Sequence, residues 1–159
     1  TYLAFIFNIA LTSLYLLKKR IKKNEGYSNK AYVDKLGFKT IGYGHLIKKN
    51  EKKYLTNKFS KKKLNKIFEQ DFKNAFQAYN KVFKSNNHTK NTKEVLIEML
   101  FQLGAKKQKK FIKMNKHINE NNLFMAALEM KKSLWYKQTP TRVDGLIETL
   151  LKKQYEKKR

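Results

Sequence analysis

The sequence contains no cysteine, and its three histidines, His45, His88 and His117, are scattered along the chain. Without thiols no disulfide can form, and no two histidines have the His-x-x-x-His spacing that is typical of a zinc site. The sequence therefore predicts no metal site and leaves the redox compartment open. His88 and His117 lie in segments rich in Lys and Asn, so both are expected to be surface residues.

Acidic residues and arginine are also scarce. Twelve Asp and Glu stand against 37 Lys and Arg, which gives a formal net charge of +25, but only Arg20, Arg142 and Arg159 are arginine. A strongly basic chain is attracted to polyanions, whereas specific contacts to phosphates and bases usually need the bidentate guanidinium. This lysine-rich composition indicates coding bias and a solvated surface, and no specific nucleic-acid binding is expected.

Glycine and proline interrupt the chain rarely, with six residues and one residue. The 159 residues, of which 41% are hydrophobic and 13% aromatic, are enough for one domain with its own core and exclude a disordered chain. Gly37 and Gly42 separate short apolar and β-branched runs between residues 31 and 47. This pattern predicts three short strands, which must pack against helices to be stable.

Helical periodicity follows the predicted strands. Apolar residues recur at three- and four-residue steps from Ser60, the expected N-cap, to Phe83, and again from Thr92, a second expected N-cap, to a stop at Gly104. Further helices are expected at 111–118, 121–130 and 141–155. Short strands in one part of the chain and helices in the rest favour the α+β fold class.

The first seventeen residues are nearly all apolar and end at Lys18-Lys19-Arg20. This run is short for a membrane-spanning helix, which needs about 20 residues, and long for the core of a signal peptide. Two interpretations stay open: an export or anchor segment, or a longer first helix whose apolar face packs on the core or on a partner. In an anchor, the cations that follow would hold the rest of the chain in the cytoplasm, unless upstream residues carry more charge.

Residues 25–45 carry the side chains best suited to chemistry. They contain, in order, Glu25-Gly26, Tyr32, Asp34, Gly37 and Thr40-Ile41-Gly42-Tyr43-Gly44-His45. Two carboxyl groups followed by a hydroxyl suit the cleavage of a glycosidic bond. That reaction needs a protonated acid on one side of the bond and a base that activates water on the other.

This order of residues resembles the phage-type lysozymes, the muramidase family of the T-even bacteriophage enzyme. Further blocks match in the family's order at 68–71, 96–104 and 133–142, so the resemblance runs from about residue 17 to near the C-terminus. It implies an α+β, lysozyme-like two-lobe fold, in which a long helix joins a small three-stranded antiparallel sheet to a helical lobe, with a cleft between the lobes. Residues 1–13 would be an apolar N-terminal extension, and residues 14–159 the catalytic domain.

The resemblance implies an endolysin-type muramidase that hydrolyses the β-1,4 bond between N-acetylmuramic acid and N-acetylglucosamine in peptidoglycan, with inversion and without a cofactor. Glu25 is expected to keep its proton in a partly buried pocket and to donate it to the leaving oxygen. Asp34 and Thr40 are expected to position and activate the attacking water. A turn-forming role for Asp34 and a plain strand role for Thr40 are the alternatives.

Other matches concern residues that support the site or bind sugar. His45 and Asp71 match a pair that ties the sheet to the long helix by a charge-assisted hydrogen bond, which would raise the pKa of the histidine. Arg142 matches the arginine that faces the catalytic glutamate. The matches to the sugar groove are Leu46, Phe101, Gln102, Gln138 and Thr139, of which Leu46 and Phe101 suit a core position equally well. Trp135 and Tyr136 are expected to pack inside the helical lobe.

The sequence departs from the family in three places. Asn24 and Gly145 replace the two members of an ion pair, so no orphan charge remains. Glu98 stands where the family usually has a neutral amide, and a buried glutamate needs a partner that the sequence does not identify. The segment between His45 and Ser60 is shorter than in the phage enzyme, which alters the outer wall of the groove.

The basic surface supports a second hypothesis. A bacterial envelope carries anionic polymers and lipid head groups, which such a surface attracts in a salt-dependent way. The alternative function is therefore a non-enzymatic cationic antibacterial or membrane- and polyanion-binding protein on a lysozyme fold. In either case a monomer is expected to act at the bacterial cell wall. It would stay cytoplasmic until released, or be exported and membrane-tethered through residues 1–17.

Overall fold

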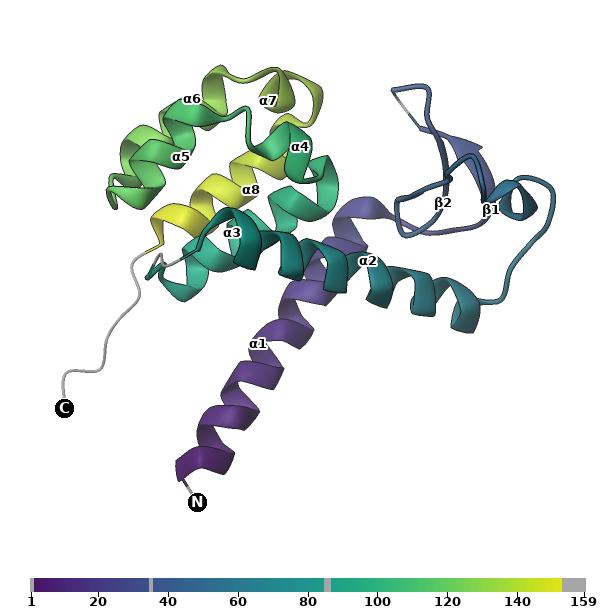
Figure 1. Ribbon diagram of the computed structural model, residues 1–159, viewed down its shortest axis with the longest axis horizontal. Coiled ribbons are helices and arrows are strands. Elements are labelled where there is room, and N and C mark those ends of the chain that lie inside the picture. Colours follow the sequence, from purple (N-terminus) through teal and green to yellow (C-terminus); the bar gives the residue numbers. More distant parts are fainter. Residues whose placement is uncertain (1, 35, 85–86, 153–159) are drawn as a thin grey trace. The chain divides into compact units, whose positions relative to one another are not determined.

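A long helix, a small sheet and a set of helices follow one another along the chain (Figure 1). The computed structural model describes residues 2–34, 36–84 and 87–152, with side chains placed from residue 10 onward. Compact packing divides the chain into two units, Thr1–Asn74 and Ala75–Arg159. The elements are α1 (Tyr2–Glu25), β1 (Ser28–Val33), β2 (Lys39–Gly42), β3 (His45–Leu46), the 3-10 helix η1 (Lys52–Tyr54), α2 (Lys61–Val82), α3 (Lys90–Leu103), α4 (Ala105–Gln108), α5 (Ile112–Asn119), α6 (Leu123–Lys132), α7 (Leu134–Gln138) and α8 (Pro140–Leu151).

The sheet of the first unit has its three strands in chain order and antiparallel, as the sequence predicts. Tyr32 of β1 lies opposite Thr40 of β2, and Thr40 lies opposite Leu46 of β3. The backbone N–H of Asp34 donates to the carbonyl of Phe38 at 2.9 Å, which closes the β1–β2 hairpin. Phe38, expected in a strand, therefore belongs to the turn.

Apolar residues of the sheet and the two long helices form the core of the first unit. Ile41 of β2, Tyr54 of η1 and Leu64 of α2 make one buried cluster. Leu17 and Ile21, on one side of α1, are also fully buried. The short strands thus pack against helices, because a three-stranded sheet of this size cannot bury enough apolar surface alone.

Lysines of α1 pack over aromatic rings inside this unit. The Nζ of Lys22 lies 4.6 Å from the ring centroid of Phe68 and 5.0 Å from that of Tyr43, and the Nζ of Lys18 lies 5.0 Å from that of Phe72. An ammonium group over a ring face gains electrostatic attraction while its alkyl stem covers apolar surface. Partial burial lowers the pKa of Lys22, although the nearby Glu69 acts in the opposite direction.

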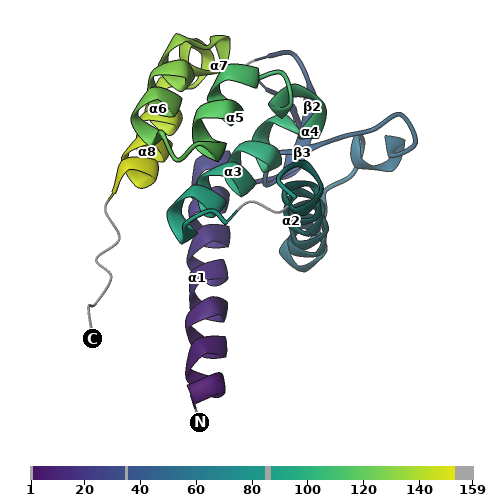
Figure 2. The same cartoon turned by 60° about the vertical axis from the view of Figure 1, so that its left-hand side comes forward.

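The helix α1 runs without a break from Tyr2 to Glu25, and its N-terminal half extends beyond the rest of the first unit (Figures 1 and 2). Residues 2–13 are therefore continuous with the helix that carries Glu25, while a functional boundary at residue 13 stays a prediction. Within the described part of the chain, no helix combines the length and the apolar character needed to cross a bilayer.

The second unit is built around α3, in which every residue from Val95 to Leu100 is buried. The predicted N-cap at Thr92 is wrong, because α3 begins earlier and the side chain of Thr89 accepts the N–H of Thr92 at 3.3 Å. Ser60 does cap α2, since its Oγ accepts the N–H of Lys63 at 3.2 Å.

The other helices of this unit lie near their predicted ranges, with two additions. The short helices α4 and α7 were not predicted, because four or five residues are too few to show a periodic pattern. The helix α8 begins at Pro140 and ends at Leu151, and the remainder of the predicted 141–155 range from residue 153 lies outside the described residues. His88 is not a simple surface residue, because it contacts Tyr79 at 2.9 Å and Asn119 at 3.3 Å.

The partner of Glu98 comes from α8. Glu98 is 0% exposed, and its Oε1 accepts a hydrogen bond from Nε of Arg142 at 3.2 Å. This contact answers the question that the sequence left open. A buried carboxylate is tolerated when a cation and hydrogen bonds compensate for its lost hydration.

Arg142→Met removes the guanidinium that Glu98 contacts, and we expect it to lower the free energy of unfolding by about 3–5 kcal/mol. The double variant Glu98→Gln/Arg142→Met removes both charges and should recover more than half of that loss. Glu98→Gln alone keeps an acceptor oxygen and should cost less than the arginine variant. Urea denaturation of the four proteins measures these differences, and a double variant as unstable as Arg142→Met would contradict this account.

Candidate active site

Glu25 is the last residue of α1 and lies against the turn between β2 and β3. Gly26 ends the helix with a φ of +73°, and its N–H donates to the carbonyl of Lys22 at 3.1 Å. A Cβ atom added at Gly44 would lie 2.9 Å from the carboxyl carbon of Glu25 and 3.2 Å from its Cγ. Only glycine at this position allows the Glu25 side chain to lie so close to the backbone of the sheet.

Asp34 follows β1 and organises the β1–β2 turn. Its Oδ1 accepts the N–H of Leu36 at 2.9 Å and the N–H of Phe38 at 2.8 Å. The turn-forming role is therefore present, and it fixes the carboxylate through one oxygen. Oδ2 accepts no hydrogen bond from the described residues, so a second role for this side chain is compatible with the first.

Tyr32, Thr40 and Leu46 form one row across the sheet. Residues opposite one another in antiparallel strands project to the same face, so these three side chains share a face. Thr40 is 4% exposed, and its hydroxyl donates to the carbonyl of Phe38 at 3.2 Å. Since the proton of Thr40 is used in this way, its oxygen can still accept a hydrogen bond on its lone pairs. Leu46 is exposed, so it is not a core residue.

Tyr32 is linked to two of the candidate catalytic residues, which the sequence did not reveal. Burial raises the pKa of its phenol, and the carboxylates of Glu25 and Asp34 both raise it further. Both carboxyl groups therefore act on the same hydroxyl. Its place in the family motif was the only sequence signal for such a role.

His45 is held between two carboxylates. Its Nδ1 lies 2.7 Å from Oδ2 of Asp71 on α2, and its Nε2 lies 3.1 Å from Oε2 of Glu51. A neutral imidazole has one N–H, so both nitrogens can donate only when the ring is protonated. The hydrogen bond to Asp71 raises the pKa of His45, Glu51 acts in the same direction, and burial opposes them. His45 lies opposite Ile41 and next to Leu46. The strands that carry Thr40 and Leu46 are therefore fixed beside a charged histidine.

Glu51 is a second residue whose role was missed. Burial alone would raise the pKa of Glu51, but the N–H of Lys48, at 3.0 Å, and His45 outweigh this and lower it. Glu51 therefore fastens the segment between β3 and α2 to the sheet. No pattern in the sequence indicates that Glu51 pairs with His45, six residues earlier in the chain.

In the second unit, two of the residues expected around sugar, Gln102 and Thr139, are joined through Trp135, the only tryptophan of the sequence. Trp135 is buried, and its Nε1 donates to Oε1 of Gln102 at 2.9 Å. The Nε2 of Gln102 lies 3.5 Å from the hydroxyl of Thr139, which donates to the carbonyl of Trp135 at 3.1 Å. Gln138 is exposed and Phe101 is half-buried. The packing role expected for Trp135 thus includes holding the Gln102 amide.

Several expectations join residues of different units. Glu25, Asp34, Thr40, Leu46, His45 and Asp71 belong to the first unit, while Phe101, Gln102, Gln138, Thr139 and Arg142 belong to the second. A contact between Arg142 and Glu25, and a shared sugar groove, therefore stay predictions. Among the described residues, no group of three His, Cys, Asp or Glu side chains is arranged to hold a metal ion.

The buried His45 and the half-buried His88 should respond to pH in opposite ways. For His45 the folded pKa is raised, so its stabilising effect is complete below about pH 6.5 and is lost as the pH rises through the folded value. For His88, burial lowers the folded pKa, so its effect is complete above about pH 6.5 and is lost as the pH falls through the folded value.

We therefore expect His45→Gln to lower the free energy of unfolding by about 2 kcal/mol near pH 5.5 and by less near pH 9. His88→Gln should show the reverse order, with the larger loss near pH 9, and is the matched control. Urea unfolding of the three proteins at both pH values measures the effect. A loss in His45→Gln that grows with pH would contradict the charged state assigned to this ring.

Comparison with known proteins agrees with this arrangement. The family model described as "Phage lysozyme" matches residues 22–153. A protein named "Probable T4-type lysozyme 2" from Dictyostelium discoideum is 35% identical, over 88% of this chain and 98% of the relative. Another, "Probable T4-type lysozyme 1" from the same organism, is 28% identical over 84% of this chain and 92% of the relative. The chain therefore belongs to the phage lysozyme family, the family of T4-type glycoside hydrolases.

Proposed function

We propose that this chain is a muramidase that hydrolyses the β-1,4 bond between N-acetylmuramic acid and N-acetylglucosamine in peptidoglycan, with inversion at the anomeric carbon. Membership of the lysozyme family implies peptidoglycan as the substrate. The observation that carries the finer proposal is the position of Tyr32. Its phenol is influenced by both Glu25 and Asp34 and lies on the sheet face that also presents Thr40. Two carboxyl groups thus act on a phenol that shares its sheet face with the Thr40 hydroxyl.

Glu25 is the proton donor in this proposal. Its side chain is partly buried at the end of α1 and lies over Gly44, where the backbone leaves room for a carboxyl group and little else. The proton passes to the glycosidic oxygen as the bond to the anomeric carbon breaks, so the leaving sugar departs as a neutral alcohol. The charge that develops on the sugar ring is then neutralised by the attacking water from the opposite side.

Asp34 and Thr40 are the groups that hold this water. One oxygen of Asp34 is fixed by the turn, and the hydroxyl of Thr40 donates to Phe38. Both side chains therefore act as acceptors for the two hydrogens of a water molecule, which directs its lone pair toward the sugar. Asp34 takes the proton that the water loses, so one proton enters at Glu25 and one leaves at Asp34 in each turnover. Inversion follows because the water attacks opposite the leaving oxygen.

The proposal places this activity at the bacterial cell wall, as an endolysin-type or antibacterial enzyme. A second candidate function is non-enzymatic binding to the anionic envelope, which the net charge of +25 favours. The two differ in one respect. Binding by charge alone does not need the carboxyl group of Glu25 and is abolished by high salt.

Glu25→Gln keeps the shape of the side chain and removes the proton donor, so we expect clearing of a cell-wall suspension to fall at least about 10³-fold. Asp34→Asn should lower the clearing as well. Glu69→Gln, which changes an exposed carboxylate on α2, should retain activity and is the matched control. Walls digested by the unmutated chain are reduced with borohydride and hydrolysed. Muramitol among the products supports the proposed bond, whereas glucosaminitol or anhydromuramic acid would reject it.

Gly44→Ala tests whether the activity depends on the position of Glu25 rather than on the stability of the fold. The added Cβ displaces the flexible Glu25 carboxyl, so activity should fall roughly 10- to 100-fold. Gly42→Ala is the control in the same turn, because its φ is +66° against +74° and its Cβ would meet Leu64 at an ordinary 3.4 Å. Both should lose about 1–2 kcal/mol of stability from the positive φ. If Gly44→Ala and Gly42→Ala lose the same activity, displacement of Glu25 is not the cause of the loss.

A further inference from the structure

The first part of α1 lies outside the region that defines the family. The family model begins at residue 22, whereas α1 begins at Tyr2. Residues 10–21, whose side chains the structure describes, precede the stretch that the family model matches, and their contacts are therefore read from the structure itself.

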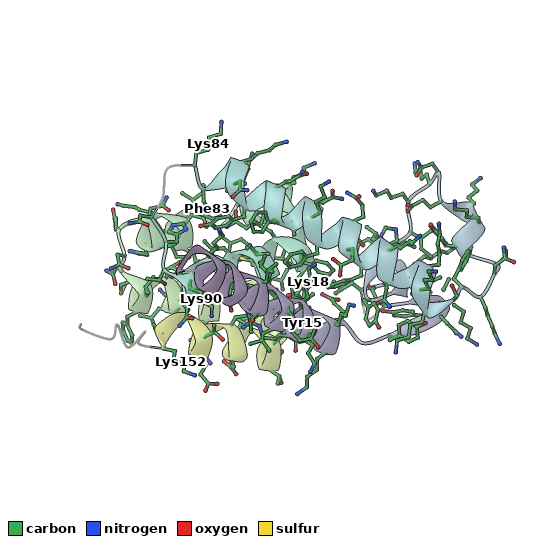
Figure 3. All side chains as sticks on the ribbon, turned by 90° about the horizontal axis from the view of Figure 1, so that it is seen from below. Tyr15, Lys18, Phe83, Lys84, Lys90 and Lys152 are labelled. Carbon is green, nitrogen blue, oxygen red and sulfur yellow. The ribbon has the colours of Figure 1, made fainter. Side chains whose placement is uncertain are left out.

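One side of α1 is packed. Leu17 and Ile21 are buried, the Nζ of Lys18 lies 2.5 Å from Oε2 of Glu69, and the Nζ of Lys22 lies 3.0 Å from Oδ1 of Asn65. In Figure 3, which views the chain from below, Lys18 is labelled on α1 together with Tyr15.

An exposed ridge lies beside this packed side of α1. Leu11, Tyr15 and Leu16 are 49%, 60% and 56% exposed, and Lys19 and Lys23 are exposed as well. With 3.6 residues per turn these five positions fall within an arc of about 140° around the helix, and Leu11 lies at the edge next to the packed side. We call these five residues the outward ridge.

The outward ridge changes character along the helix axis. Its N-terminal part is apolar, its C-terminal part is cationic, and the Nζ of Lys19 lies 5.8 Å from the ring centroid of Tyr15. Five cations and no acidic residue occur before Glu25. An apolar tip, an aromatic ring with a polar end and then a group of lysines match the order of acyl chains, interface and head groups in a lipid leaflet.

We infer that the outward ridge docks on an anionic lipid bilayer, with Leu11 and Leu16 in the acyl region and Lys19 and Lys23 at the head groups. A soluble polyanion would satisfy the lysines but would offer nothing to the leucines. A second copy of the chain would cover the leucines but would bring like charges together. Only an anionic membrane surface supplies both an apolar phase and the opposite charge. This inference does not depend on the proposed hydrolysis.

The test is co-sedimentation of the full chain with vesicles of phosphatidylcholine, alone or with about 30% phosphatidylglycerol. We expect binding to the mixed vesicles to exceed binding to phosphatidylcholine at least about tenfold and to weaken with salt. Leu11→Gln/Tyr15→Gln/Leu16→Gln should reduce binding at least about tenfold. The matched control, Ile112→Gln/Phe124→Gln/Leu134→Gln, removes side chains that are 76%, 65% and 68% exposed in the second unit and should bind normally.

Two double lysine variants test the cationic part of the outward ridge. Lys19→Glu/Lys23→Glu should weaken binding at least about tenfold, and Lys109→Glu/Lys110→Glu, with the same change in net charge, should weaken it much less. These lysines are exposed, so the comparison holds even if a triple variant fails to fold. Equal binding by the two lysine variants, or equal binding to both kinds of vesicle, overturns the inference. So does a dimer in sedimentation velocity that the ridge variant converts to a monomer, because the occupant is then a second copy.

Discussion

The close approach of Glu25 to Gly44 is the constraint on which the first unit depends. It joins the last residue of α1 to the turn between β2 and β3, so the helix and the sheet must meet at a fixed point. Near this point Lys22 of α1 packs over the rings of Tyr43 and Phe68. His45, in the strand that follows this turn, is held in place by Asp71 and Glu51. The Glu25 carboxyl group thus takes its position from the way α1 meets the sheet.

The sequence predicted features that repeat or that are local, and missed features that depend on distant contacts. The α+β class, the three-stranded sheet and the long helices were correct, because apolar periodicity and glycine positions report them directly. The Thr89 cap and the short α4 and α7 were not, because a single polar residue or a helix of four or five residues leaves too weak a local pattern. The partnership of Glu98 with Arg142 was not, because it joins residues far apart in the sequence. The roles of Tyr32 and Glu51 became visible only with the sheet register and the turn that brings Glu51 to His45.

Several of the few carboxylates in this lysine-rich chain hold other groups in place. Asp34 organises a turn, Asp71 and Glu51 hold a histidine, and Glu98 meets an arginine inside the helical unit. The lysines are accommodated differently. Some lie over aromatic rings, as Lys18 and Lys22 do, and most face water, where salt screens their repulsion. A net charge of +25 is therefore compatible with a specific fold, because the anions are placed where neutralisation matters.

The bond from Trp135 to Gln102 has a spectroscopic consequence. The chain has a single tryptophan, so all indole emission comes from one buried ring whose N–H is held by that amide. Anything that draws the amide oxygen of Gln102 away, or changes the polarity around it, alters the hydrogen bond that the excited indole experiences. The unlabelled protein thus contains its own optical reporter for the surroundings of this amide in the helical unit.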